Sequence, residues 1–215
     1  MYMKIYVMHY TKLMERKIYI IEQFRQHNIT NYEFIEKYNQ DDITDEAKFY
    51  TKNYKLSTMS LHLKHLYLYK MLSEGSEDAI VFEDDVLLCE NFMETLNKYL
   101  NQLPGDYDML FLGNGCNLHI EKDKIVPGKF VYEKGLYPTS WGGDGASRCS
   151  DSYIISNQCA KKLFGYVKKL TKPISLPIDW WLNQAARDIK LKMYWAEPTI
   201  VQQGSQIGMF QRSIS

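Results

Sequence analysis

The chain has 215 residues, of which 45% are hydrophobic and 24% charged, so it is long enough for one folded domain and its composition excludes disorder. We assign residues 1–215 to a single domain with a less regular tail from about residue 202. The chain has 26 lysine plus arginine residues and 26 aspartate plus glutamate residues. It therefore lacks the excess of basic residues that would indicate a nucleic-acid partner. No stretch reaches the roughly 20 apolar residues of a membrane span.

The expected compartment follows from the N-terminus and the cysteines. Residues 1–8 are too short and too alternating for a signal peptide, and they predict a strand instead. The four cysteines show no CxxC spacing, which argues against a zinc site. We therefore expect a cytoplasmic protein whose thiols are reduced.

The first part of the chain predicts alternating strands and helices. The strands are expected at residues 2–8, 32–35 and 79–82. The helices are expected at residues 12–26, near residues 44–50, and from Ser57 or Ser60 to Leu72. Thr11 is the expected N-cap of the first helix, and the stripe expected to pack on the sheet is Met14, Ile18, Ile21 and Phe24. This order of elements indicates an α/β domain.

The second part continues the pattern with a long irregular stretch in its middle. Strands are expected at residues 107–113, 152–155 and 191–195, with shorter pieces at 129–132 and 135–137. Helices are expected at residues 91–100, from an N-cap at Ser156 to about Leu170, and after Pro177. The glycine-rich segment Ser140–Gly145 is either a mobile flap over a ligand or a plain glycine turn.

One run combines a buried strand with a cluster of acids. The apolar residues 79–82 lead directly into Glu83, Asp84 and Asp85. Three carboxylates cannot stay in an apolar core as unpaired charges, so they should emerge at the end of the strand. Ligands of open α/β sheets bind at the carboxyl ends of the strands, and carboxylate oxygens suit hard cations. The run is therefore either a cation site or an acidic turn whose charges are solvated or cap the next helix.

Several short blocks follow one another in a recognisable order. They are Ile5–Arg16, Phe82–Asp85, Tyr107–Gly113, Ser152–Ser156, Leu176–Asp179, Glu197–Pro198 and Gln202–Ser205. This order resembles glycosyltransferase family 25, which includes bacterial lipooligosaccharide galactosyltransferases and procollagen galactosyltransferases. The resemblance covers essentially the whole chain and makes collagen glycosylation, beside glycan biosynthesis, a setting to consider.

The resemblance implies a GT-A fold, which is a Rossmann-like α/β domain with a central, mostly parallel sheet flanked by helices. It also implies a metal-dependent, inverting transfer of a hexose from UDP-galactose, UDP-glucose or UDP-N-acetylglucosamine to a hydroxyl on a glycan or glycosylated protein. The family's acidic motif maps onto Glu83, Asp84 and Asp85. Asp85 is then expected to coordinate Mn²⁺ or Mg²⁺ directly, while Glu83 or Asp84 holds metal-bound water or the ribose. We assign Glu83 to the metal and Asp84 to the donor.

The remaining site assignments come from the other matching blocks. Asp179 lies in the family's Pro-x-Asp block and is expected to be the base that takes the acceptor proton, or else a helix cap. Tyr10, Thr11 and Arg16 map onto the nucleotide side, where Arg16 pairs either a phosphate or a structural carboxylate. Of the neighbouring Trp180 and Trp181, one is expected in the core and the other could meet the acceptor.

Two departures from the family pattern leave alternatives open. Lys64-His65 stands where many members have Ser-His, and Gln202–Ser205 lacks the histidine of procollagen-type members. A third metal ligand is therefore not assigned, and His65 fits a core position better than a ligand position. The rival hypotheses are a catalytically inactive nucleotide-sugar-binding module and a metal-dependent hydrolase. A homodimer is compatible with the sequence.

Overall fold

The computed structural model describes residues 3–134 and 148–211, and the main sheet of that part has seven strands in the order β2-β1-β3-β7-β5-β8-β6. A separate two-stranded sheet pairs β4 with β9. The strands are β1 (Lys4–Met8), β2 (Tyr32–Ile35), β3 (Ala79–Glu83), β4 (Val86–Leu88), β5 (Met109–Phe111), β6 (Val131–Glu133), β7 (Ser152–Ile155), β8 (Met193–Ala196) and β9 (Val201–Gln203).

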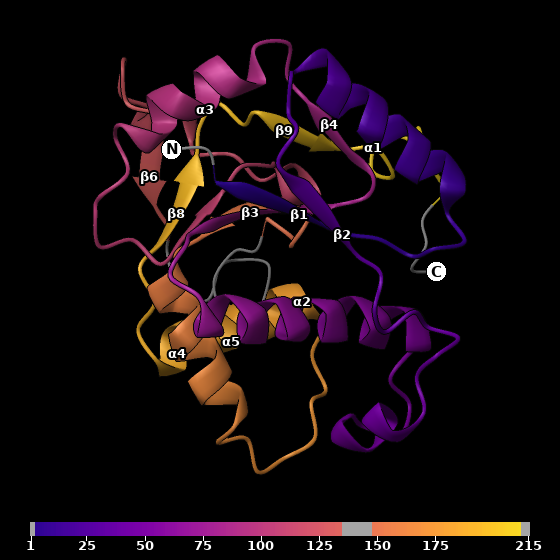
Figure 1. The fold of residues 1–215 in the computed structure, drawn as a ribbon. Helices are drawn as coiled ribbons and strands as arrows, with labels where there is room; N and C mark the ends of the chain where they lie inside the picture. The colour runs from indigo at the N-terminus through magenta and orange to yellow at the C-terminus, as the bar shows by residue number, and fades with distance from the viewer. Residues whose placement is uncertain (1–2, 135–147, 212–215) are drawn as a thin grey trace.

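Helices cover both faces of the main sheet (Figure 1). On one face lie α2 (Leu56–Glu74), α4 (Asn157–Val167) and α5 (Ile178–Asp188), and on the other lie α1 (Met14–Gln26) and α3 (Phe92–Leu100) together with β4 and β9. The short 3-10 helices are η1 (Asp45–Phe49), η2 (Gly115–Asn117) and η3 (Lys122–Lys124). Within the described residues, no helix has the length and apolar character of a membrane span.

Successive residues of the central strands fill two cores, one on each face of the sheet. Val81 and Tyr153 belong to the core under α2, α4 and α5, whereas their neighbours Phe82 and Ile154 belong to the core under α1 and α3. This alternation follows from the two-residue period of a strand. Because both faces are covered by helices, a continuous apolar run such as residues 79–82 is buried on both sides.

The predicted α/β class is confirmed, and the sheet is mixed. In the described part of the chain, β1, β2, β3, β5 and β8 run in one direction and β6 and β7 run in the other. The reversed strand β7 lies between β3 and β5, so its first residues are at the same edge of the sheet as the last residues of its two neighbours. A buried strand has the same residue types whether it runs parallel or antiparallel to its neighbours. The sequence pattern therefore did not indicate that β7 is reversed.

Helix α1 presents a different face to the sheet from the one predicted. Met14, Ile18 and Ile21 are exposed, whereas the buried residues are Arg16, Ile20, Gln23 and Phe24. Gln23 explains this orientation, because its amide donates to the Val86 carbonyl at 2.8 Å and accepts from the Leu88 N–H at 2.9 Å. Arg16 adds a buried ion pair described below. Polar partners on the neighbouring segment thus override the apolar stripe.

The predicted start of α1 is also wrong, while two other helix starts are confirmed. Helix α1 begins at Met14 and Thr11 lies outside it, where its hydroxyl accepts a hydrogen bond from Asn39 Nδ2 at 3.1 Å. Ser156 caps α4 by accepting from the Cys159 N–H at 3.1 Å, and α5 begins directly after Pro177. The predicted strand piece at residues 135–137 and the glycine-rich segment 140–145 lie outside the described residues.

Candidate active site

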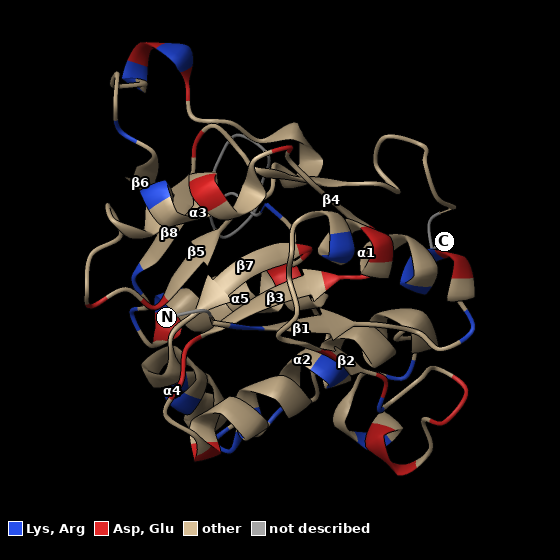
Figure 2. Cartoon of the chain, turned by 45° about the horizontal axis from the view of Figure 1, so that its top comes forward, with Lys and Arg blue, Asp and Glu red and all other residues tan. Residues whose placement is uncertain are grey.

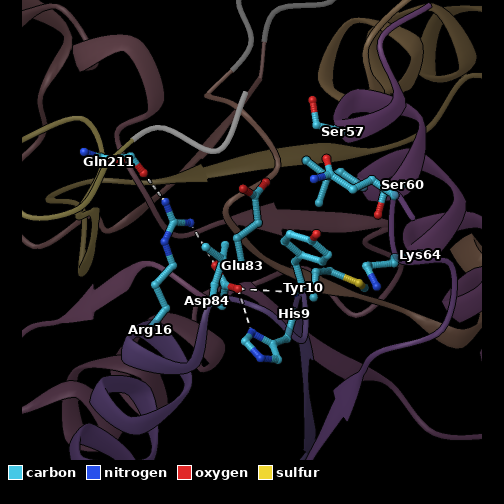
Figure 3. A pocket seen from close by; sticks show the side chains of 13 residues that line it. His9, Tyr10, Arg16, Ser57, Ser60, Lys64, Glu83, Asp84 and Gln211 are labelled. Carbon is cyan, nitrogen blue, oxygen red and sulfur yellow. Dashed lines mark hydrogen bonds and ion pairs between the residues drawn. The ribbon is translucent and has the colours of Figure 1, made fainter. Parts of the chain in front are cut away.

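Asp84, the central residue of the acidic run, is a buried carboxylate held by three donors (Figure 3). Arg16 Nη1 donates to Asp84 Oδ1 at 3.0 Å, and His9 Nδ1 lies 2.7 Å from Asp84 Oδ2. The Tyr10 backbone N–H also donates to Oδ2, at 3.4 Å. Arg16 therefore pairs a carboxylate, which was one of its two predicted partners, and Asp84 joins α1 to the ends of β1 and β3.

Arg16 lies between the acidic run and the C-terminal segment. Its Nη1 is 3.7 Å from Asp85 Oδ2, its Nη2 donates to the Gln211 carbonyl, and its guanidinium carbon is 5.5 Å from the centre of the Phe210 ring. These contacts account for the burial of a cation, since a buried charge needs both an ion pair and hydrogen bonds. Arg16 is thus a structural centre for this edge of the sheet.

Asp85 and Asp151 each leave one buried carboxylate oxygen without a hydrogen-bond partner among the described residues. Asp85 is 2% exposed, and its Oδ2 accepts from the Ser205 N–H at 3.3 Å while Oδ1 has no such partner. Asp151 is 1% exposed, and its Oδ2 accepts from the Ser152 hydroxyl at 2.8 Å while Oδ1 has none. Buried carboxylate oxygens normally have a partner, so these two atoms indicate a missing cation or donor.

Glu83, the last residue of β3, is hydrogen-bonded to the segment that leads into β7. The Glu83 N–H donates to the Asp151 carbonyl at 2.8 Å, which continues the pairing of β3 with β7, and the Ser150 hydroxyl donates to Glu83 Oε1 at 2.9 Å. In Figure 3 the Glu83 carboxylate points away from Asp84, as alternation along a strand requires. Figure 2 shows the acidic segments at the ends of β3 and β7 beside α1.

Burial and neighbouring negative charges raise the pKa of two of these acids, Glu83 and Asp151. The pKa of Glu83 is raised well above its usual range, first by burial and then by the negative charges of Asp85 and Asp151. Burial likewise raises the pKa of Asp151 to about 7, with a further contribution from Asp85. Mutual repulsion of this kind falls when a cation binds between the carboxylates.

A pocket of about 280 Å³ opens beside the acidic run, between the ends of β1 and β3 and the start of α2. Its lining includes Tyr10, Arg16, Ser60, Lys64, Glu83 and Asp84. Lys64 is buried, with its ammonium donating to the Lys37 carbonyl at 2.7 Å and to Asn39 Oδ1 at 3.2 Å. Burial lowers the pKa of Lys64 to about 8. The pocket thus carries a buried cation beside its carboxylates.

The structure places the predicted site residues in three groups. Tyr10, Arg16, Glu83 and Asp84 line the pocket, and Asp85 follows them in the buried layer next to Gly204 and Ser205. Thr11 is exposed and does not line the pocket. Asp179 lies in the first turn of α5, outside the pocket lining, and burial raises its pKa.

Asp179 nevertheless belongs to the same side of the sheet as the acids. Burial raises the pKa of the Cys149 thiol, and the negative charges of Asp151, Asp179 and Glu83 each contribute to that shift. Trp181 is buried in the core, which confirms that one of the two tryptophans packs inside, and Trp180 is half-buried beside Asp179.

Sequence reasoning missed Asp151, Lys64 and the role of His9. Asp151 precedes a strand that runs against its neighbours, so only the topology brings it to the acidic run. Lys64 lies within a helix, and nothing in its spacing indicates that it is buried. His65 is a buried core histidine, as expected, with Nδ1 2.6 Å from the Tyr153 hydroxyl.

The family resemblance implies a divalent cation at this site. Among the described residues, no three His, Cys, Asp or Glu side chains form a ready-made metal cluster. The unpartnered oxygens of Asp85 and Asp151, beside Glu83, still provide the hard oxygen donors that Mn²⁺ or Mg²⁺ prefers. The donor atoms thus have the chemistry that such an ion prefers, while the described side chains are not gathered into a group of three.

An α/β sheet with carboxylates and a pocket at the carboxyl ends of its parallel strands is typical of α/β proteins that bind a ligand there. Comparison with protein families identifies the family of this protein, because the model for glycosyltransferase family 25 (LPS biosynthesis protein) matches residues 2–182. The chain belongs to this family and is a glycosyltransferase with a GT-A fold. It therefore takes a nucleotide-sugar donor and an acceptor. A search of curated proteins found no match.

Proposed function

We propose that this glycosyltransferase moves a hexose from a UDP-sugar, such as UDP-galactose, UDP-glucose or UDP-N-acetylglucosamine, to a hydroxyl on a glycan or glycosylated protein, with inversion at the anomeric carbon. A lipopolysaccharide glycan fits the family description, and a collagen acceptor remains a second substrate to test. The observation that supports this proposal best is the pair of buried carboxylate oxygens of Asp85 and Asp151 that lack a hydrogen-bond partner in the described structure.

Asp85, Glu83 and Asp151 are the residues that would hold Mn²⁺ or Mg²⁺. When bound, such an ion neutralises negative charge that develops on the diphosphate leaving group. Asp84 has a different role in this proposal, because both of its oxygens already accept hydrogen bonds from Arg16, His9 and Tyr10. Asp84 would therefore position the neighbouring acids at the wall of the pocket, with both carboxylate oxygens already engaged.

The pocket is the proposed donor site. Its buried Lys64 ammonium supplies a positive charge for phosphate oxygens. The Tyr10 ring lines the same pocket and donates its hydroxyl to Asp41 Oδ2 at 2.6 Å, which fixes the ring at the pocket rim. Ser60 adds a hydroxyl to the wall, although it already donates to the Tyr38 carbonyl at 2.6 Å. These groups match a ligand with a flat base and a diphosphate.

Asp179 is the proposed base. The acceptor oxygen would attack the anomeric carbon as the carbon–oxygen bond to the diphosphate breaks, and the hydroxyl proton would pass to the Asp179 carboxylate. Burial raises the pKa of Asp179, which increases its affinity for this proton. The half-buried ring of Trp180 lies beside it and offers an aromatic surface to an acceptor sugar.

Measurements on D85N test the metal assignment. We expect Mn²⁺-dependent binding of UDP, followed by calorimetry, to disappear and the transfer rate to fall at least about 100-fold. D151N should weaken Mn²⁺ binding about 10-fold or more, and D123N, an exposed Asp-to-Asn control, should change neither. Metal-dependent UDP binding and turnover that persist unchanged in D85N would refute the assignment.

D179N separates the base from a helix cap. If Asp179 is the base, the variant should bind UDP-sugar with wild-type affinity and lose transfer by about 100-fold or more. If Asp179 only supports the start of α5, transfer should persist and the free energy of unfolding should fall by about 1 kcal/mol. A wild-type chain that binds UDP-sugars but transfers to no acceptor would instead support a binding module without turnover.

A further inference from the structure

Two cysteines that are distant in sequence face each other near the acidic site. Cys116 Sγ and Cys149 Sγ lie 3.7 Å apart, a contact distance for two thiols. Cys116 belongs to η2, and Cys149 precedes the strand β7. Disulfide formation needs the sulfurs to approach to about 2.05 Å, so modest side-chain rotations would close this gap.

The backbone holds the two cysteines against each other. A Cβ atom added at Gly115 would lie 1.9 Å from the Arg148 carbonyl oxygen and 2.7 Å from the Cys149 nitrogen, so the two segments cross in close contact and only glycine fits. Arg148 is buried and anchored, because its Nη1 donates to the Ala196 carbonyl at 2.6 Å and its Nη2 pairs with Glu197. The residue before each cysteine is therefore fixed.

Both cysteines also have the left-handed backbone conformation, with φ of 59° at Cys116 and 63° at Cys149. Non-glycine residues adopt it rarely, and asparagine is the usual exception. The segment that contains Gln206 contacts both cysteines. Gln206 Oε1 accepts from the Cys116 N–H at 3.3 Å, and Gln206 Nε2 donates to Cys149 Sγ at 3.8 Å. Two unusual backbone positions thus place two thiols together.

Access differs between the cysteines. Cys116 is exposed and Cys149 is half-buried, whereas Cys159 is fully buried in the core under α4. Because Cys116 is the more exposed of the two, it is the one that reacts first with a reagent from solution. Cys149 then lies close enough to complete the reaction.

We propose that Cys116 and Cys149 form a reversible disulfide by exchange with a low-molecular-weight disulfide. The Cys116 thiolate attacks one sulfur of the reagent and releases one small thiol, which leaves a mixed disulfide on Cys116. The Cys149 thiolate then attacks the Cys116 sulfur, forms the protein disulfide and releases the second small thiol. The two protons lost by the cysteines appear on the two released thiols. The exchange itself does not require the proposed sugar transfer.

The disulfide would close a ring through residues 117–148 and fix the segment that leads into the acidic site. Ser150, the residue after Cys149, donates to Glu83 Oε1 at 2.9 Å, and Asp151 follows. A ring of this length reduces the conformational entropy of the unfolded chain. We therefore expect a rise in Tm of about 5–10 °C on oxidation. The same bond would restrain one wall of the carboxylate cluster.

The test uses the full chain incubated with oxidised glutathione, followed by alkylation and peptide mapping. We expect a peptide pair joined through Cys116 and Cys149, with Cys89 and Cys159 still alkylated, and full reversal by dithiothreitol. C89S should behave like the wild type, and C116S should form no linked pair and show no rise in Tm. C149S is expected to stop at a stable glutathione adduct on Cys116. Wild-type protein in which both Cys116 and Cys149 remain alkylatable, or which retains glutathione on Cys116 without a linked pair, would refute the proposal.

Discussion

At the scale of single residues, the site depends on one buried ion pair. Arg16 is 5% exposed and contacts Asp84 directly and Asp85 at longer range, so it compensates two negative charges inside the protein. Removing one partner of such a pair costs more than the pair itself contributes, because the other charge stays buried without compensation. Arg16 is therefore expected to matter for stability as well as for the site.

R16M should lower the free energy of unfolding by about 3–5 kcal/mol. The reason is that Asp84 and Asp85 would then stay buried without their shared cation. The double variant R16M/D84N should recover part of this loss, and urea denaturation of the four proteins in the cycle gives the coupling. R25M, which removes an exposed cation paired with Glu22, is the matched control and should leave the denaturation midpoint unchanged. A loss in R16M no larger than in R25M would contradict the prediction.

The sequence allowed the acidic run to be predicted but not how its members divide their roles. Three carboxylates after an apolar strand could not stay unpaired in an apolar core, and the structure places them at the end of β3, where Asp84 and Asp85 are buried and Asp84 is paired. Residues that are distant in sequence decide which carboxylate already accepts hydrogen bonds and which can bind a ligand. His9 and Arg16 engage Asp84, and the Ser205 N–H engages one oxygen of Asp85. Such partners cannot be read from spacing within the run.

At the scale of elements, α1 shows how polar contacts override an apolar pattern. The predicted stripe and the buried face share only Phe24. Gln23 bridges two backbone groups of β4, and Arg16 reaches the acidic run, so rotating the helix to bury Met14 and Ile18 would break these contacts. Leaving buried polar groups unpaired costs about 1–3 kcal/mol each, which exceeds what burying a half-exposed apolar side chain contributes.

A matched pair of substitutions tests the orientation of α1. I20A should lower the free energy of unfolding by about 2–4 kcal/mol, because Ile20 is fully buried against the core under α1. I18A removes the same atoms from a side chain that is 64% exposed, and it should change the stability by less than about 0.5 kcal/mol. Chemical denaturation of both variants measures the difference, and similar losses in the two would show that the helix packs in the predicted orientation instead.

At the scale of the whole molecule, topology assembles the site. The final residues of β1 and β3 meet the residues before β7 because β7 runs against β3 and β5. The sequence indicated most strands and helices, since their apolar periods are local. It could not indicate that β7 is reversed or that Asp151 lies beside Glu83, because strand order is decided by contacts between distant segments. The α/β class was therefore predictable, and the full set of acids was not.

The pH dependence of stability is a property of the core under α2. Burial lowers the pKa of both His62 and His65 to about 3, below the usual value of 6.5. Between those values the unfolded chain binds protons that the folded chain does not, so each histidine makes folding less favourable as the pH falls below about 6.5. Glu83 and Asp151 act in the opposite sense, because their raised pKa values favour the folded state on acidification.

Comparing H65Q with the wild type isolates one histidine from these opposing groups. The glutamine keeps a polar partner for the Tyr153 hydroxyl but has no proton to gain. Between pH 7.5 and pH 5.0, the wild type should therefore lose about 2 kcal/mol more stability than H65Q, since about 1.5 pH units below 6.5 correspond to that energy per group. Urea denaturation at both pH values, in the presence of EDTA, gives the four free energies of unfolding. Equal losses in the two proteins would mean that His65 takes up its proton while the fold is intact, and the helix α2 would then have to open locally around it.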